Sequence, residues 1–146
     1  MKLFSQKNVK KYDKMYKSGH DHSYPNLDLV RILSSYIKPK NSNILDYGFG
    51  SGQNLIHLTK LNFKEIHGLE PSKEAIKLVK KKLKKNQKTK VNLRQLYSTE
   101  NKLPYFSETF DNIICTSVLS LLEKKNKVKF LIQEFHRILK KNGKLI

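Results

Sequence analysis

Cysteine and tryptophan are almost missing from this chain. Its 146 residues include a single cysteine, Cys115, and no tryptophan. One cysteine cannot form an internal disulfide, and it cannot supply a cysteine-based zinc site. Both kinds of framework are therefore excluded, and the fold must be held by a packed core. An apolar share of 38% suits a core of this kind in one domain.

Long apolar runs are also missing. No run approaches the roughly 20 residues that a membrane-spanning helix needs. The first residues, Met1-Lys2-Leu3-Phe4-Ser5, lead into polar sequence where a signal peptide would carry its apolar stretch. We therefore expect a cytoplasmic protein that has no membrane partner.

Acidic residues are scarce, because 12 Asp and Glu stand against 30 Lys and Arg, and the formal charge is +18. Charge of this sign attracts nucleic acid by neutralising phosphates. The densest run, 80–85, lies in a stretch of helical apolar spacing, so its lysines are expected to form a solvated helix face. Base recognition favours arginine, and the chain has only three: Arg31, Arg94 and Arg137. Affinity for nucleic acid is expected only as an incidental property.

Apolar residues recur along the chain in two alternating patterns, one with the spacing of a helix and one typical of a strand. Helical spacing occurs at 27–37, 55–61, 71–85 and 126–139, and strand patterns occur at 43–47, 65–70, 91–96, 110–115 and 144–146. Strands that alternate with helices predict an α/β fold, a parallel sheet with helices on both faces. The last strand stops at its third residue, so we expect a fragment or a naturally shortened form that ends after the fifth strand.

The first predicted strand runs into the glycine-rich turn Asp46-Tyr47-Gly48-Phe49-Gly50-Ser51-Gly52. Glycines at such a turn let a nucleotide-like ligand approach the backbone. A dinucleotide fingerprint would need glycine where Gln53 stands, and Asp46 would repel a pyrophosphate. Glu70 ends the second predicted strand, where an acid accepts hydrogen bonds from a ribose diol. This combination predicts an adenosine-like ligand with a cationic tail.

These features together resemble the class I S-adenosylmethionine-dependent methyltransferases. Four segments are similar to the family's motifs, in the family's order: 44–52 to the first motif, 69–72 to the acidic end of the second strand, 103–105 with 110–114 to the loop and fourth strand, and 135–145 to the turn into the fifth. Lys141-Asn142 stands where Pro-Gly is usual. The resemblance implies a Rossmann-like methyltransferase fold with strand order 3-2-1-4-5 and S-adenosylmethionine as the cofactor.

The resemblance also assigns cofactor contacts residue by residue. Glu70 would hold the ribose hydroxyls, and Pro71 would lie against the adenine. Thr99 stands where the family usually has an adenine-binding acid, so the adenine contact is assigned to the group Ser98-Thr99-Glu100. The methionine part and its methyl group would contact the remaining residues: Asp46, Gly48, Gly50, Gly52, Ser117 and Val118.

Residues 1–24 are expected, from the same resemblance, to form a cap segment ahead of a cofactor-binding domain at 25–146. Side chains expected to line the pocket from this segment are Tyr12, Tyr16, His20 and Tyr24. The weak candidates for a catalytic residue are His20, His22 and Tyr24, because imidazole titrates near neutrality and suits a general base. A polar loop without a catalytic role is the alternative. The two histidines lack further ligands, so no metal site is expected.

The predicted function is methyl transfer from S-adenosylmethionine to an acceptor, expected to be a small molecule. The resemblance implies direct displacement at an already activated methyl group, for which the protein supplies alignment and a dry pocket. The alternative is a non-enzymatic, basic RNA-binding module on the same scaffold. A NAD-dependent oxidoreductase is disfavoured by Gln53 and Asp46.

Overall fold

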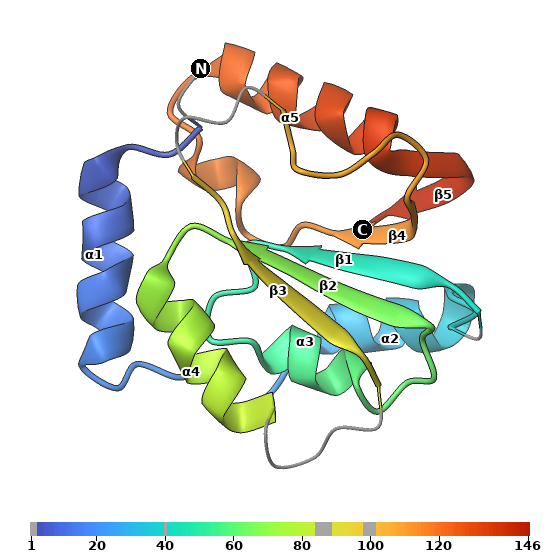
Figure 1. Ribbon diagram of the computed structural model, residues 1–146, viewed down its shortest axis with the longest axis horizontal. Coiled ribbons are helices and arrows are strands. Elements are labelled where there is room, and N and C mark those ends of the chain that lie inside the picture. Colours follow the sequence, from blue (N-terminus) through green and yellow to red (C-terminus); the bar gives the residue numbers. More distant parts are fainter. Residues whose placement is uncertain (1–2, 40, 84–88, 98–101) are drawn as a thin grey trace.

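The computed structural model describes residues 3–39, 41–83, 89–97 and 102–146. Five parallel strands form one sheet in the order β3-β2-β1-β4-β5 (Figure 1). The strands are β1 (Asn43–Tyr47), β2 (Glu65–Glu70), β3 (Val91–Gln95), β4 (Phe110–Ile114) and β5 (Leu139–Leu145). The helices are α1 (Gln6–Lys17), α2 (Leu27–Tyr36), α3 (Gln53–Leu58), α4 (Lys73–Leu83) and α5 (Lys125–Ile138), with a 3-10 turn at Leu119–Leu121. The predicted α/β class and strand order are confirmed.

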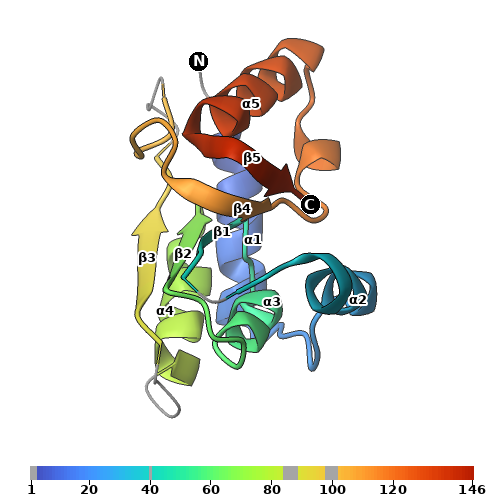
Figure 2. The same ribbon diagram turned by 90° about the vertical axis from the view of Figure 1, so that its right-hand side faces the viewer.

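Strand residues that alternate between the two sheet faces bury two separate cores. Ile44 and Ile66 pack in one core with apolar residues of α2, α3 and α4. Leu45 and Leu69 point the other way and pack with Leu131 and other residues of α5. Figure 2 shows this arrangement edge-on, with α5 on one face of the sheet and α2, α3 and α4 on the other. Helices therefore cover both faces, as the sequence predicted.

The first helix, α1, was not predicted from the sequence. It begins after Ser5, whose hydroxyl accepts a hydrogen bond from the Asn8 amide at 3.1 Å. No residue of α1 is fully buried, and its composition is dominated by lysine and polar residues, so it has no buried apolar face. The available signal was the N-cap serine together with Val9, Tyr12 and Tyr16 at helical spacing.

The fifth strand differs from the prediction. The sequence predicted a helix to Leu139, a turn at 142–143 and a strand at 144–146, whereas β5 already begins at Leu139. Its pairing with β4 is irregular, since Phe110 pairs with Leu139 but Asn112 pairs with Lys144. The structure therefore has a shift in register where the sequence predicted a turn, and the residues of that turn belong to the strand. Asn142 has a φ of 68°, a left-handed conformation that asparagine tolerates better than most residues.

The glycine-rich turn after β1 is held close to α4 by Gly52, the N-cap residue of α3. Gly52 has a φ of 81°, and a Cβ atom built on it would lie 2.3 Å from Cγ2 of Val79. Val79 is fully buried in α4. The absence of a side chain at Gly52 therefore sets the distance between the turn and α4.

We expect Gly52→Ala to lower the free energy of unfolding by about 2–4 kcal/mol, because it adds a steric collision to left-handed strain. Gly19→Ala is the matched control. Gly19 has a φ of 91° with no atom within 4 Å of a built Cβ, so only strain of about 1 kcal/mol is expected. Urea denaturation measures the free energy of unfolding of both variants. Equal losses in the two variants would contradict this role of Val79, whereas Val79→Ala should recover part of the loss in Gly52→Ala.

Candidate functional site

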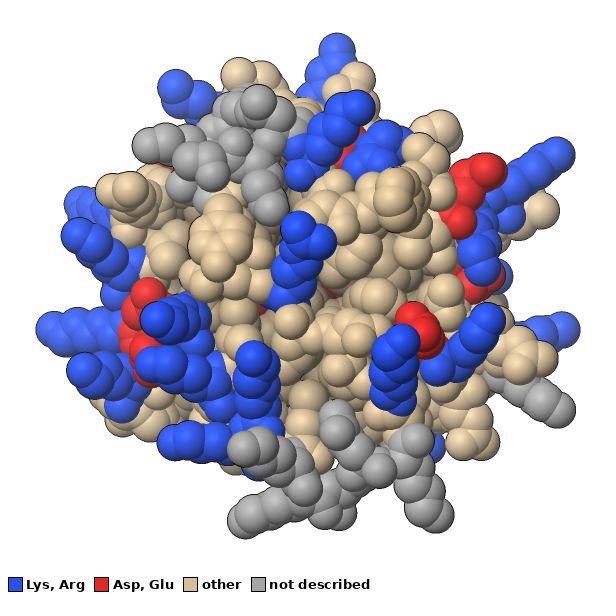
Figure 3. Space-filling model, in the orientation of Figure 1, with Lys and Arg blue, Asp and Glu red and all other residues tan. Residues whose placement is uncertain are grey.

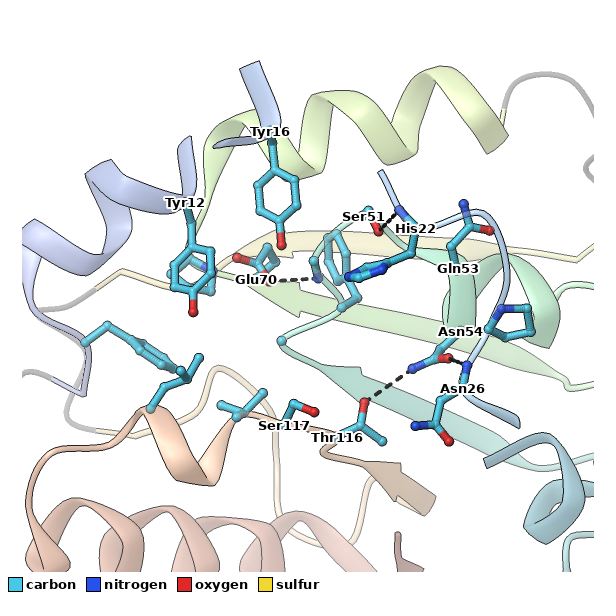
Figure 4. A pocket seen from close by; sticks show the side chains of 18 of the residues that line it. Tyr12, Tyr16, His22, Asn26, Ser51, Gln53, Asn54, Glu70, Thr116 and Ser117 are labelled. Atoms are coloured by element: carbon cyan, nitrogen blue, oxygen red, sulfur yellow. Dashed lines mark hydrogen bonds between the residues drawn. The ribbon is translucent and has the colours of Figure 1, made fainter. Parts of the chain in front are cut away.

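A cavity of about 580 Å³ lies at the carboxyl ends of β1, β2 and β4, beneath α1 (Figure 4). This volume falls within the range of small-molecule sites, about 300–1,000 Å³. Its walls come from four parts of the chain: the glycine-rich turn with the start of α3 at 48–54, the end of β2 at 70–71, the segment 116–121 after β4, and side chains from 4–28. The carboxyl ends of parallel strands are where α/β proteins bind ligands.

Gly50 forms the floor of the cavity opposite α1. A Cβ atom built on Gly50 would lie 2.7 Å from the hydroxyl oxygen of Tyr16, so a larger residue would displace this hydroxyl, and the left-handed φ of 52° also favours glycine. The Gly50 amide donates a hydrogen bond of 3.0 Å to Oε2 of Glu70. Gly48 also lines the cavity, as the sequence analysis expected of this turn.

Glu70 connects the turn to the start of α4. Its side chain is only 6% exposed, and its Oε1 accepts a hydrogen bond of 2.9 Å from the Ser72 amide while Oε2 accepts the bond from Gly50. Burial raises the pKa of Glu70, although these two amide bonds act in the opposite direction. Each carboxylate oxygen has capacity for a second hydrogen bond. Glu70 lines the cavity, and so does its neighbour Pro71.

Asp46 is not among the residues that line the cavity, and its expected contact with the methionine part stays a prediction. The side chain is 1% exposed, and its Oδ2 accepts no hydrogen bond within the described ranges. Burial, reinforced by the charge of Glu70, raises the pKa of Asp46 to about 7. Asp46 lies on the same sheet face as Ile44.

The other expected contacts divide into three groups. Ser117 and Val118 line the cavity, and Ser117 has a left-handed φ of 59°. Gly52 faces Val79 of α4 and is not among the lining residues, so its expected contact stays a prediction. Ser98-Thr99-Glu100 lies outside the described residues.

The N-terminal segment covers the cavity with aromatic side chains. Tyr12, Tyr16, His22 and Tyr24 line it, whereas His20 does not. In Figure 4, Tyr12 and Tyr16 point down from α1 toward the side of the cavity where Glu70 lies. Burial raises the pKa of Tyr16, and Glu70 and Tyr12 add to this effect, so its hydroxyl remains protonated.

Helix α1 is fixed to the start of α4 by Asp13. Oδ1 of Asp13 accepts hydrogen bonds from the Ser72 hydroxyl at 2.6 Å and from the Glu74 amide at 3.2 Å. The Ser72 oxygen in turn accepts a bond from the Ala75 amide at 3.2 Å, so both side chains satisfy the amides at the beginning of α4. The orientation of the two tyrosines over the cavity follows from this attachment.

The segment 20–26 is tied to the glycine-rich turn and to α3. The His22 amide donates to the Ser51 hydroxyl at 3.3 Å, and Gln53 donates to Asp21 at 3.2 Å. Lys82 of α4 forms an ion pair with Asp21 and donates to the Ser51 carbonyl at 2.9 Å. The segment therefore closes one side of the cavity through contacts with three different elements.

Sequence reasoning missed a polar chain on the opposite side. Oδ1 of Asn54 accepts a bond of 2.9 Å from the Asn26 amide, and its side-chain amide donates to the Thr116 hydroxyl at 3.3 Å. All three residues line the cavity. The signal was positional, because Asn54 lies in the first turn of the helix after the glycines and Thr116 lies two residues after the end of β4.

The charge of the cavity is opposite to that of the chain. None of its described lining residues is Lys or Arg, although the chain has 30 of them, and Glu70 and Asp28 contribute carboxylates. The arrangement favours a polar ligand that carries positive charge.

In the described part of the chain, no group of three or more His, Cys, Asp or Glu is arranged to hold a metal ion. Within the same residues, no helix is long and apolar enough to cross a membrane.

A family model described as a methyltransferase domain matches residues 45–146. Three solved structures are similar to this chain at probability 1.00. The [4+2]-cyclase SpnF has a TM-score of 0.78 and 18% identity over 97% of this chain and 59% of its own. An S-adenosylmethionine-dependent methyltransferase from Methanosarcina mazei has a TM-score of 0.68 and 24% identity, over 86% of this chain and 57% of its own. A protein assigned to the same class from Methanococcus maripaludis has a TM-score of 0.70 and 24% identity, over 99% of this chain and 64% of its own.

No curated protein gave a significant match to this sequence. The chain spans 57–64% of the length of the three solved proteins described above. Identities below 25% establish the fold, and the match of the family model over most of the chain establishes the family. The turn at 46–52, the acid at the end of β2 and the strand order agree with both. The chain therefore belongs to the class I S-adenosylmethionine-dependent methyltransferases.

Proposed function

We propose that the cavity binds S-adenosylmethionine and that the protein transfers its methyl group to a small-molecule acceptor. The observation that carries this proposal is the acidic cavity over a glycine-rich turn, walled without Lys or Arg among its described residues. A ligand with a pyrophosphate would be repelled by Glu70 and would lack a cationic partner. A ligand with a cationic tail is favoured by the same charges.

The residues present fit this cofactor. Glu70 has hydrogen-bonding capacity left for a ribose diol, and Pro71 stands beside it at the end of β2. Gly48 and Gly50 line the cavity, and the space that their missing side chains leave is taken up by Val118 and by the Tyr16 hydroxyl. Asp46, whose Oδ2 has no hydrogen-bond partner within the described residues, supplies a negative field for the positively charged methionine part.

Bound S-adenosylmethionine supplies a methyl group on a sulfonium, an already activated leaving group, so this chain needs no nucleophile of its own. The contribution of its residues is to orient the reactants and exclude water. Tyr12 and Tyr16 cover the cavity from α1. Ser117 and Val118 close it from the loop after β4. His22 is our candidate for holding a proton released by the acceptor, and Tyr24 is a second candidate.

We further propose that residues 1–24 act as a cap that retains the cofactor over the domain at 25–146. The ion pair between Lys82 and Asp21 and the bond from His22 to Ser51 support this role. The cap also contributes apolar side chains, Phe4 and Val9, to the cavity wall. These side chains suit a small acceptor with an apolar portion.

Fold likeness alone does not decide the reaction, because one of the similar structures is a [4+2]-cyclase. Binding and methyl transfer are therefore tested separately. No observation favours an RNA-binding module or an oxidoreductase over the proposed reaction.

S-adenosylmethionine at about ten times its Kd is expected to stabilise the protein by about 1.4 kcal/mol, a rise in Tm of about 4 °C for a chain of this size. Glu70→Gln should lose most of this rise. The carboxylate accepts hydrogen bonds from two backbone amides, and the glutamine side chain would turn its own NH2 group toward one of them. Each variant's shift is measured by calorimetry against its own ligand-free Tm. Glu123→Gln, outside the cavity, is the control, and NADH is the comparison ligand. A larger shift with NADH, or none with millimolar S-adenosylmethionine, would overturn the proposal.

Asp21→Asn and Lys82→Gln are each expected to raise the dissociation rate of S-adenosylmethionine several-fold, because they release the cap from α4. The stability of the fold should change by less than about 1 kcal/mol, since this ion pair is partly exposed. Lys77→Gln removes another ion pair of α4, with Glu74, and is the matched control. Surface plasmon resonance gives the rates. Unchanged dissociation in both cap variants would count against a retaining role.

A further inference from the structure

Asp46 and Glu70 form a buried acidic pair behind the glycine-rich turn. Asp46 is 1% exposed and its Oδ2 has no hydrogen-bond partner within the described residues, while Glu70 uses its carboxylate to accept from the amides of Gly50 and Ser72. No salt bridge of the described chain involves either acid. Such an arrangement keeps two like charges out of water without a cation between them.

The groups that surround the pair add no fixed positive charge. Cys115 follows β4, and burial together with Asp46 raises the pKa of its thiol to about 12, so the thiol is neutral. From α1, the carboxylate of Asp13 and the protonated hydroxyl of Tyr16 act on Glu70. His22 is the only imidazole among the described lining residues, and it is exposed. Lys and Arg are distributed around the outer surface of the molecule (Figure 3).

Two buried carboxylates that interact titrate as a pair. The repulsion between them, added to burial, raises the pKa of Asp46 to about 7. The pair therefore retains a proton in half of the molecules at neutral pH when no ligand is bound. A positive charge placed beside it would favour the ionised form of both acids and lower that pKa.

We propose that a cationic ligand displaces a proton from the Asp46–Glu70 pair, so that this site discriminates in favour of positively charged adenosine derivatives and does so more strongly as the pH rises. This inference rests on the proposed function. In this step the O–H bond of the carboxylic acid breaks, the proton passes to the buffer, and the carboxylate stays with the ligand's positive charge. An uncharged ligand provides no such compensation and leaves the proton in place.

The direction and size of the change in affinity with pH follow from the linkage between ligand binding and proton release. Below pH 7 the ligand must expel the proton before both acids can face it as anions, whereas above pH 7 the proton has already left. The cation lowers the pKa from about 7 in the free protein, and if the pair is fully ionised in the complex, affinity rises about tenfold between pH 6 and pH 8. About half a proton is released per ligand bound at pH 7.

Isothermal titration calorimetry tests this directly. S-adenosylmethionine, S-adenosylhomocysteine and adenosine are titrated at pH 6, 7 and 8, each in two buffers with different ionisation enthalpies, which gives affinity and proton release together. We expect the tenfold rise for S-adenosylmethionine and none for adenosine. S-adenosylhomocysteine keeps the amino group but lacks the sulfonium. If the affinity for S-adenosylhomocysteine depends on pH as that for S-adenosylmethionine does, the effect belongs to the ammonium group. If it depends on pH as that for adenosine does, the effect belongs to the sulfonium. Either outcome supports the proposal.

Asp46→Asn removes the titrating acid at nearly constant shape and should make the affinity for S-adenosylmethionine almost independent of pH, apart from the ligand's own amino group, which titrates near 8 in both proteins. Asp28→Asn removes an exposed carboxylate of the same cavity, leaves the buried pair intact and should keep the dependence.

Binding of S-adenosylmethionine without proton release, or equal release with adenosine, would overturn this inference and leave the proposed function standing. Failure of S-adenosylmethionine to bind at all would overturn both. If Asp46→Asn does not fold, the comparison of S-adenosylmethionine with adenosine on the unmodified protein still decides the question.

Discussion

The carboxylate of Glu70 is the contact on which the whole site depends. One of its oxygens accepts from the Gly50 amide and the other from the Ser72 amide, so it joins the glycine-rich turn, the end of β2 and the start of α4. Ser72 passes the connection on to Asp13 and thereby to α1. Four parts of the chain are thus positioned by a single buried acid. Such a carboxylate is costly to bury, and backbone hydrogen bonds offset part of that cost.

The net charge of +18 and the acidity of the cavity are compatible because the positive and negative side chains lie in different places. Lysine side chains are long and strongly hydrated, so they remain on helix surfaces such as the outer face of α4. Several of the described acids lie at strand ends and helix starts, among them Glu70, Asp28 and Glu74. As a result, the overall charge describes the surface of this protein and not its cavity.

The strand order, the glycine-rich turn and the acid at Glu70 could be predicted from the sequence because each depends on local periodicity or on a short motif. The depth of Asp46 could not. It lies two residues before the first glycine, which suggested a contact, but its side chain is only 1% exposed, on the sheet face that it shares with Ile44. Helix α1 was missed because its stability comes from its capping residue Ser5 and from docking onto α4, and it has no buried apolar stripe.

The family match and the cavity do not cover the same residues. The match begins at residue 45, whereas a large share of the cavity wall comes from 4–28, including Tyr12, Tyr16, His22 and Tyr24. The matched part carries the floor of the cavity, where the glycine-rich turn and Glu70 lie. The unmatched part carries the roof, and in the proposed function the second reactant would enter there. Since a shared fold does not fix what such a roof admits, we propose that the choice of acceptor rests on the residues of α1 and of the segment that follows it.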